Sequence, residues 1–318
     1  MKRYRIVIVF LMILAVCSCK KDEDEKFDVE IVDPRPLSEV AIENDAELIE
    51  YFSTHFYNYE EFENPPADFD FEIKISPIDE NNLDKTAIID SDRLSFVDLK
   101  VSSNTFPGDI PEETDISHRL YFLSARDGGG ENPTVVDSVY IQYEGFTLDD
   151  NVFENNLTWF DLQGTGTIEN SGQFVQGFKE GLVLLKDGNN LIENVDGTFN
   201  IDDSGIGVIF MPSGLAYFNS GQVGAAFSPI AFKVDMLEAN QADHDRDGIP
   251  SILEDLNANL DLFDDNTDET DFPNYLDADD DNDDIPTIDE IELDADGKFV
   301  GFKDTDGDGT PDHLDNDN

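Results

Sequence analysis

Carboxylates recur at alternate positions in a short stretch near the C-terminus. In DHDRDGIPSILE, Asp243, Asp245 and Asp247 occupy positions 1, 3 and 5, a glycine follows at position 6, and Glu254 occupies position 12. Hard oxygen ligands with this spacing can wrap a Ca²⁺ ion inside one loop, with a main-chain carbonyl at position 7 completing the set. We therefore expect cation binding in this stretch.

The same spacing returns further along the chain. Two further copies supply Asp279, Asp281, Asp283 and Glu290, and then Asp304, Asp306, Asp308 and Asp315. A degenerate copy spans residues 266–277, and all four copies carry proline at position 8. The copies resemble thrombospondin type 3 repeats, because the flanking helices of EF-hands are missing. The sequence predicts structural Ca²⁺ within residues 239–318; the alternatives are a disordered acidic tail and Mg²⁺, whose octahedral shell fits this spacing less well.

The composition excludes several other chemistries. With 19 Lys and Arg against 73 Asp and Glu, the net charge is -54, so the field of the protein repels nucleic-acid phosphates. The 4 histidines are scattered, which excludes a zinc cluster, and no P-loop phosphate motif occurs. Both cysteines, Cys17 and Cys19, lie at the N-terminus, so the folded part has no structural disulfide. We expect no nucleic-acid partner and no catalytic cofactor.

Five segments in the middle of the chain carry aromatic residues in a fixed order. They are VYIQYEGF (139–146), NVFENN (151–156), QGFKEGL (176–182), SGLAYF (213–218) and PIAFKVDMLE (229–238). In this order they resemble an FKBP-type peptidyl-prolyl cis-trans isomerase. The resemblance implies rotation of X-Pro bonds, whose barrier of roughly 18–20 kcal/mol arises from amide resonance. An apolar cup that desolvates the amide favours the twisted, less polar transition state.

The resemblance also implies which side chains form that cup. They are Tyr143, Phe153, Val175, Phe178, Tyr217 and Phe232, with Glu154 standing where the family has aspartate. Phe178 replaces the family's usual tryptophan at the floor. Tyr217 would donate its hydroxyl to the substrate carbonyl, and Val175 would offer its backbone N–H. Trp159, the only tryptophan, is expected to serve packing.

The sequence departs from the family pattern in three respects. Glu154 is one methylene longer than aspartate, which shifts its hydrogen bond. The loop before the last strand has Phe218 and Gly224-Ala225-Ala226 where the family has Gly and Ile-Pro-Pro, and insertions occur around residues 164–172 and 190–204. These departures leave a second interpretation open, in which an FKBP-like scaffold binds without turnover and is displayed on a calcium-stabilised stalk for adhesion or assembly.

Residues 136–238 must supply the elements that position the cup. Val139, Ile141 and Tyr143 alternate with Tyr140, Gln142 and Glu144, which predicts a strand with one buried face. The apolar residues of 177–188 recur at helical spacing, which predicts a helix there. Two further strands are predicted at residues 207–212 and 229–237. We expect an α+β fold in which a curved antiparallel sheet packs on one short helix, as the resemblance to FKBP implies.

Residues 39–135 are expected to form a small helical and strand region of unknown role. Asn44 is predicted to cap a helix, with Glu47 completing a capping box. Strands are predicted at residues 69–76 and 118–125, where apolar and polar residues alternate.

The N-terminus has the features of an export signal. Residues 1–19 combine a basic start, an apolar run too short to span a membrane, and Ser18 before Cys19. They resemble a bacterial lipoprotein signal, which predicts lipidation of Cys19; Cys17 is the second choice, and plain secretion is the alternative. Residues 20–38 are predicted to be an acidic, proline-containing tether, and its KKDEDE run resembles the surface-export signal of Bacteroidetes lipoproteins.

These features together predict a location and a partner. We expect an isomerase or chaperone that is lipid-anchored in the cell envelope, at the outer membrane and exposed on its surface. Its partners would be the membrane, through the lipid anchor, and proline-containing polypeptides of exported proteins. The sequence leaves the oligomeric state open.

Overall fold

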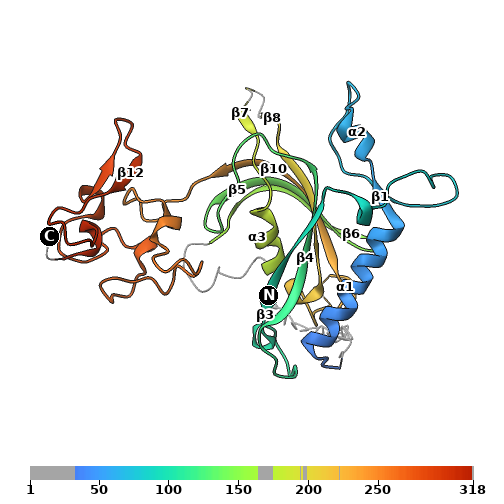
Figure 1. Ribbon diagram of the computed structural model, residues 1–318, viewed down its shortest axis with the longest axis horizontal. Helices are drawn as coiled ribbons and strands as arrows, with labels where there is room; N and C mark the ends of the chain where they lie inside the picture. Colours follow the sequence, from blue (N-terminus) through green and yellow to red (C-terminus); the bar gives the residue numbers. More distant parts are fainter. Residues whose placement is uncertain (1–32, 164–174, 194, 196–198, 222, 317–318) are drawn as a thin grey trace, which may run out of the picture. The chain divides into compact units, whose positions relative to one another are not determined.

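Six antiparallel strands form the central sheet, in the order β3-β4-β9-β10-β5-β6. The computed structural model describes residues 33–163, 175–193, 195, 199–221 and 223–316. The strands are β3 (Leu94–Val101), β4 (Ile116–Arg126), β5 (Ser138–Thr147), β6 (Val152–Asp161), β9 (Gly205–Met211) and β10 (Ile230–Asn240). Figure 1 shows that this sheet is strongly curved.

Alternating side chains give the sheet two apolar faces. On β9, Ile209 and Met211 belong to one buried cluster, whereas Val208 and Phe210 belong to another. The helix α3 (Gln176–Leu182) covers the first face, and α1 (Leu37–Thr54) packs Leu48 and Phe52 against the second. The two helices lie on opposite sides of the sheet in Figure 1. The α+β fold, with an antiparallel sheet packed on a short helix, is confirmed.

Helix α3 lies unusually close to the sheet because two of its residues are glycines. A Cβ atom on Gly177 would lie 2.6 Å from Met211 Sδ, and one on Gly181 would lie 2.5 Å from Ile209 Cγ2. The helix ends at Leu182 rather than continuing to residue 188 as predicted, and two tight turns follow it. The close approach of the helix places the Phe178 ring against aromatic side chains of the sheet.

Helix α1 differs from two predictions made for residues 20–59. The helix begins at Leu37, directly after the extended residue Pro36, so the tether ends before residue 38. Asn44 is therefore not a cap: it lies inside the helix, past its first two turns, and is buried. Leu37 and Val40 are fully buried in the main core, which explains why the helix starts early.

The N-terminal region does not form a separate unit. Strands β3 and β4 belong to the central sheet, so the expected boundary between residues 135 and 136 falls between two strands of that sheet. The predicted strand at 118–125 is confirmed within β4. The predicted strand at 69–76 is wrong for most of its length, because only β2 (Ile75–Pro77) forms, paired with β1 (His55–Tyr57).

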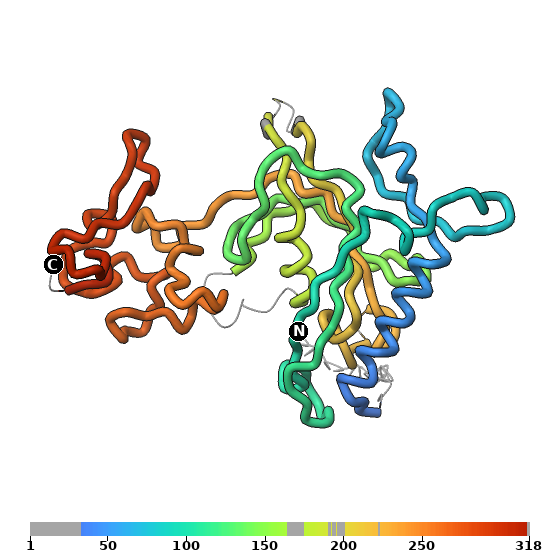
Figure 2. Tube along the Cα trace, viewed as in Figure 1, coloured from blue at the N-terminus to red at the C-terminus, as the bar shows by residue number. Residues whose placement is uncertain are grey.

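The remaining elements are short. They are α2 (Tyr59–Glu63), the hairpin of β7 (Asn189–Glu193) and β8 (Phe199–Asp202), and the tail hairpin of β11 (Ile291–Leu293) and β12 (Phe299–Phe302). The 3-10 turns are η1 (Ile88–Asp90), η2 (Ser103–Thr105), η3 (Ser213–Leu215), η4 (Ser251–Glu254), η5 (Asn274–Leu276), η6 (Thr287–Asp289) and η7 (Asp312–Leu314). Figure 2 traces the tail after β10 as a series of loops. Within the described part of the chain, no helix has the length and apolar character needed to cross a membrane.

Candidate functional site

The predicted aromatic residues converge on one pocket. A cavity of about 340 Å³ opens between β5, β6, β10, α3 and the segment after β9. It is lined by Tyr143, Glu154, Trp159, Phe160, Val175, Phe178, Tyr217 and Phe232. Every predicted cup residue except Phe153 is therefore present. We call these eight residues the aromatic cup.

Phe178 forms the centre of the aromatic cup. Its ring centroid lies 5.5 Å from that of Tyr143, 6.0 Å from that of Phe160 and 4.5 Å from that of Phe232. The side chain is almost fully buried, and aromatic pairs at these separations contribute beyond their buried area. Three strands and one helix thus hold the floor ring in a single position.

Two tyrosine hydroxyls supply the polar groups of the aromatic cup. The Tyr143 hydroxyl donates a 2.5 Å hydrogen bond to Glu154 Oε1, so the longer glutamate side chain does reach a group on the neighbouring strand. Burial, and then the hydrogen bond to Glu154, raise the pKa of Tyr143. Burial, and then the charge of Glu154, raise the pKa of Tyr217. Both hydroxyls therefore keep their protons at neutral pH, and each remains a hydrogen-bond donor.

Phe153 lies behind the aromatic cup instead of lining it. Its ring packs edge-on against Phe232, with centroids 5.5 Å apart and planes at 88°. The other side of the ring faces a neighbouring cavity of about 330 Å³, beside Glu47 of α1 and Gly224. Phe153 therefore supports the wall residue Phe232 and does not itself line the cavity.

Two residues of β6 line the aromatic cup without having been predicted. Phe160 pairs in register with Val139 on β5, which places it on the same face as Tyr143. Trp159 was expected to serve packing; it does stack on Tyr140 at 5.1 Å, but it is also 45% exposed and lines the cavity. Phe160 could have been predicted from the side-chain alternation of β5 only if the pairing register between β5 and β6 had been known.

The segment that departs from the family pattern turns away from the aromatic cup. Phe218 is buried and packs against Phe106 and Phe227, with centroids 4.7 and 5.0 Å apart. Gly224 and Ala225 line the neighbouring cavity with Phe153. None of the described residues between Tyr217 and β10 lines the cavity of the aromatic cup. The predicted insertion around residues 164–172 lies outside the described residues.

The four acidic repeats fold in one common register. The residue at position 9 is buried in every repeat, and its N–H donates to the carbonyl of the residue just before the loop. These bonds are Ser251 to Ala242 at 2.9 Å, Asn274 to Asp265 at 2.9 Å, Thr287 to Ala278 at 3.0 Å and Asp312 to Lys303 at 2.9 Å. The proline at position 8 of each repeat directly precedes a 3-10 turn. Residues 266–277 are thus a true repeat in shape, although of the ligand positions 1, 3, 5 and 12 they keep carboxylates only at positions 3 and 12, as Asp268 and Asp277.

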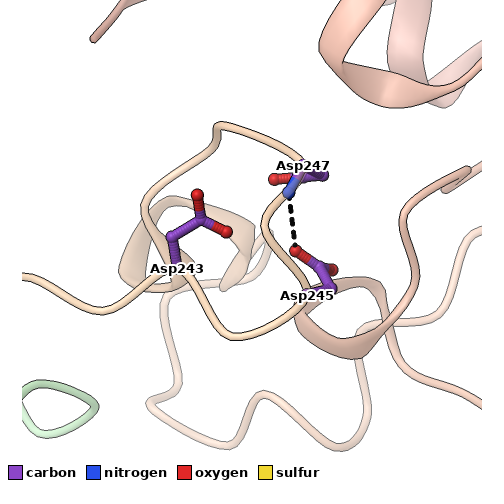
Figure 3. A group of neighbouring side chains, drawn as sticks. All are labelled: Asp243, Asp245 and Asp247. Carbon is purple, nitrogen blue, oxygen red and sulfur yellow. Dashed lines mark hydrogen bonds between the residues drawn. The ribbon is translucent and has the colours of Figure 1, made fainter. Parts of the chain in front are cut away.

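The carboxylates at positions 1, 3 and 5 gather as predicted. Figure 3 shows Asp243, Asp245 and Asp247 around one loop, with the Asp247 N–H bonded to Asp245 Oδ1 at 3.1 Å. Their carboxylate oxygens lie within 4.8 Å of one another, as do those of two further triads. These are Asp279, Asp281 and Asp283, and then Asp304, Asp306 and Asp308. The position-12 residues Glu290 and Asp315 lie outside these triads.

Glu254 joins a group that the sequence did not predict. It meets Asp247 of its own repeat and Asp280 of a later repeat, again within 4.8 Å. Glu254 and Asp280 are each 2% exposed, and neither carboxylate has a hydrogen-bond partner among the described residues. Burial, and then neighbouring aspartates, raise the pKa of Glu254 to about 11 and that of Asp280 to about 9. Buried oxygens in this arrangement fit a hard cation such as Ca²⁺, whose ligands lie 2.3–2.6 Å from the ion.

Comparisons with known proteins give weak similarities only. No family model matches the chain, and no curated protein matches it by sequence. Among solved structures, a peptidyl-prolyl cis-trans isomerase from Pseudomonas syringae pv. tomato is 18% identical, with 38% of this chain and 76% of that chain covered and a TM-score of 0.29.

Two other solved structures are similar to parts of the chain. FkpA from Escherichia coli is 20% identical over 64% of this chain and 62% of its own length, with a TM-score of 0.33. The N-terminal domain of FKBP42 from Arabidopsis thaliana is 14% identical over 42% of this chain and 97% of its own length, with a TM-score of 0.30. At these TM-scores the similarities carry no argument about activity.

Proposed function

We propose that the chain is an FKBP-type peptidyl-prolyl cis-trans isomerase, or a chaperone of that type, which acts on X-Pro bonds of exported polypeptides. The observation that supports this most strongly is the aromatic cup itself. Side chains predicted from five separate sequence segments meet around one cavity of about 340 Å³. A cavity of this size can hold a proline ring and its amide.

The chemistry requires only the residues that line the cavity. Rotation about the X-Pro bond moves no proton and forms no covalent bond to the protein, so the site needs no nucleophile or cofactor. Phe178 would seat the pyrrolidine ring, and the apolar walls would withdraw water from the planar, more polar amide. Because the twisted amide is less polar, this environment favours the transition state over the ground state.

Polar contacts would orient the substrate. The Tyr143 hydroxyl is held by Glu154, whereas the Tyr217 hydroxyl has no hydrogen-bond partner among residues 33–316 that the structure describes. We assign Tyr217 as the donor to the substrate carbonyl. Val175, directly before α3, would offer its backbone N–H to the adjoining residue of the peptide.

The tail and the N-terminus complete the proposal. Structural Ca²⁺ would be held by the acidic groups of residues 239–318, including the unpredicted Asp280. Lipidation of Cys19 and anchoring in the cell envelope, at the outer membrane, remain predictions from the sequence, since Cys19 lies outside the described residues.

Intrinsic fluorescence tests substrate recognition, because Trp159 is the only tryptophan and lies at the aromatic cup. Titration of the full-length protein with a short proline peptide is expected to change Trp159 emission in a saturable manner. The same peptide with alanine in place of proline is the matched control and should leave the emission unchanged. Equal responses to both peptides would show that the cavity does not recognise the proline ring.

A further inference from the structure

Asn44 makes an unusual set of contacts for a residue inside a helix. It lies on α1, is 1% exposed, and its side chain reaches the segment that links β9 to β10. Its Oδ1 accepts hydrogen bonds from the N–H and the Oγ of Ser213, both at 2.7 Å. Its Nδ2 donates to the carbonyl oxygen of Phe227, also at 2.7 Å. One amide group thus satisfies three polar atoms in the protein interior.

The two partners of Asn44 mark the ends of the segment that carries Tyr217. We call residues 213–221 and 223–227 the rim segment. A 2.6 Å hydrogen bond from the Phe227 N–H to the Phe218 carbonyl also links its C-terminal end to the residue that follows Tyr217. Figure 1 shows α1 beside the part of the chain between β9 and β10, in agreement with the contacts between α1 and η3. Asn44 therefore holds the two ends of the rim segment close together through its bonds to Ser213 and Phe227.

The rim segment needs such support because its backbone is strained. Phe218 and Phe227 have φ values of 43° and 64°, in the left-handed region that non-glycine residues rarely adopt. Conformations of this kind persist only where the surrounding structure fixes them. Phe218 directly follows Tyr217, so relaxation at Phe218 would move the Tyr217 hydroxyl.

Other parts of the N-terminal region contact the same segment. Phe106 packs on Phe218, and the Asn219 side chain donates a 2.8 Å hydrogen bond to the Pro107 carbonyl. The Arg35 guanidinium lies 5.6 Å from the ring centroid of Phe227. Residues before β4 thus hold the rim segment at Phe218, Asn219 and Phe227. Among the side chains that the structure describes, Asn44 is the one that bonds to both of its ends.

We propose that Asn44 is a positioning residue of the isomerase site, which fixes the rim segment so that the Tyr217 hydroxyl faces the aromatic cup. This inference rests on the proposed function. Helix stability does not explain the residue, because asparagine is a poor helix former and its amide makes no bond within α1. Only a side chain that both accepts and donates can serve Ser213 and Phe227 together.

A double-mutant cycle tests the inference in the full-length protein. The variant Asn44→Ala is expected to lower kcat/KM for a proline peptide about fivefold, with most of the loss in kcat. In a Tyr217→Phe background the same change should cost less than twofold, since the hydroxyl that it positions is absent. An equal loss in both backgrounds, or no loss in either, would overturn the inference.

A second measurement tests without any activity whether Asn44 fixes the rim segment. Amide hydrogen exchange of residues 213–227 is expected to rise at least tenfold in Asn44→Ala. Leu48→Ala is the matched control, because it removes another buried side chain from α1. Leu48 belongs to the cluster on the second face of the sheet, whereas Phe218 and Phe227 belong to the other cluster, so exchange in the rim segment should stay unchanged. Unchanged exchange in Asn44→Ala would refute the claim that Asn44 fixes the rim segment, whereas an inactive wild-type protein would refute the proposed function alone.

Discussion

Removal of Ca²⁺ from the full-length protein is expected to lower its thermal unfolding midpoint by about 5–10 °C at pH 7. At about 1 mM Ca²⁺ and a Kd near 10⁻⁴ M, each occupied site stabilises the folded state by roughly 1.4 kcal/mol. The effect reaches the main domain because Val135 and Val136 pack on Leu262 and Tyr275 of the tail. Differential scanning calorimetry with and without a chelator measures the shift.

The variant Glu254→Gln separates cation binding from general destabilisation. Glu254 is buried beside Asp247 and Asp280, and without Ca²⁺ it must bind a proton on folding because burial raises its pKa to about 11. Glutamine is neutral in both states, so the substitution is expected to raise the midpoint of the chelated protein. The same change removes a ligand, and should reduce the additional stabilisation by Ca²⁺. Glu292→Gln, at an exposed carboxylate of the same tail outside the acidic groups, is the control and should change neither value.

The chelated protein should also lose stability as the pH rises. The pKa values of Asp247, Asp245 and Asp280 are raised to about 7, 8 and 9 by burial and neighbouring charges. These groups bind protons in the folded state that they release on unfolding at pH values above their ordinary pKa, so stability falls between about pH 4 and pH 9. Ca²⁺ should reverse the slope, because it binds the deprotonated carboxylates. A midpoint insensitive to both chelator and pH would contradict the cation sites.

Replacement of the floor and donor residues of the aromatic cup is expected to remove isomerase activity. Phe178→Leu keeps most of the buried volume, so its cost in stability should stay below about 1.5 kcal/mol. Loss of the ring should nevertheless reduce kcat/KM at least tenfold, which corresponds to about 1.4 kcal/mol of transition-state stabilisation. Tyr217→Phe removes one hydrogen bond and should cost about fivefold.

Phe52→Leu is the matched control for these changes. Phe52 is as fully buried as Phe178 but belongs to the cluster on the other face of the sheet, against Tyr121 and Phe210. It should lower stability to a similar degree and leave kcat/KM within twofold of the wild type. Full activity in the combined Phe178→Leu and Tyr217→Phe variant would mean that the aromatic cup is not the catalytic site.

Local patterns were sufficient to predict most of the aromatic cup. Tyr143, Phe178 and Phe232 lie in segments whose order resembles a known family, and each segment formed the expected strand or helix. Trp159 and Phe160 were not identified, because their position depends on the pairing register of β6 with β5 and on a bulge between Gly145 and Phe146. Register is a property of two strands, which neither strand encodes alone.

Long-range contacts account for the other differences. Asn44 was predicted to cap a helix from its neighbours, but its hydrogen-bond partners lie 169 and 183 residues further along the chain. Asp280 occupies a position that the loop pattern leaves undefined, and its partner Glu254 belongs to another repeat. In contrast, the common register of the four repeats was predictable, because spacing within one loop fixes its hydrogen bonds.

The most direct test of the proposed function is catalysis of X-Pro isomerisation by the full-length protein with Ca²⁺ present. Exchange between the cis and trans forms of a proline peptide can be followed by NMR, against the Phe178→Leu and Tyr217→Phe double variant at the same concentration. We predict that the wild type accelerates exchange well above the uncatalysed rate and that the double variant does not. A folded wild type that binds the peptide, as reported by Trp159, but leaves the exchange rate unchanged would contradict the isomerase and support a binding scaffold.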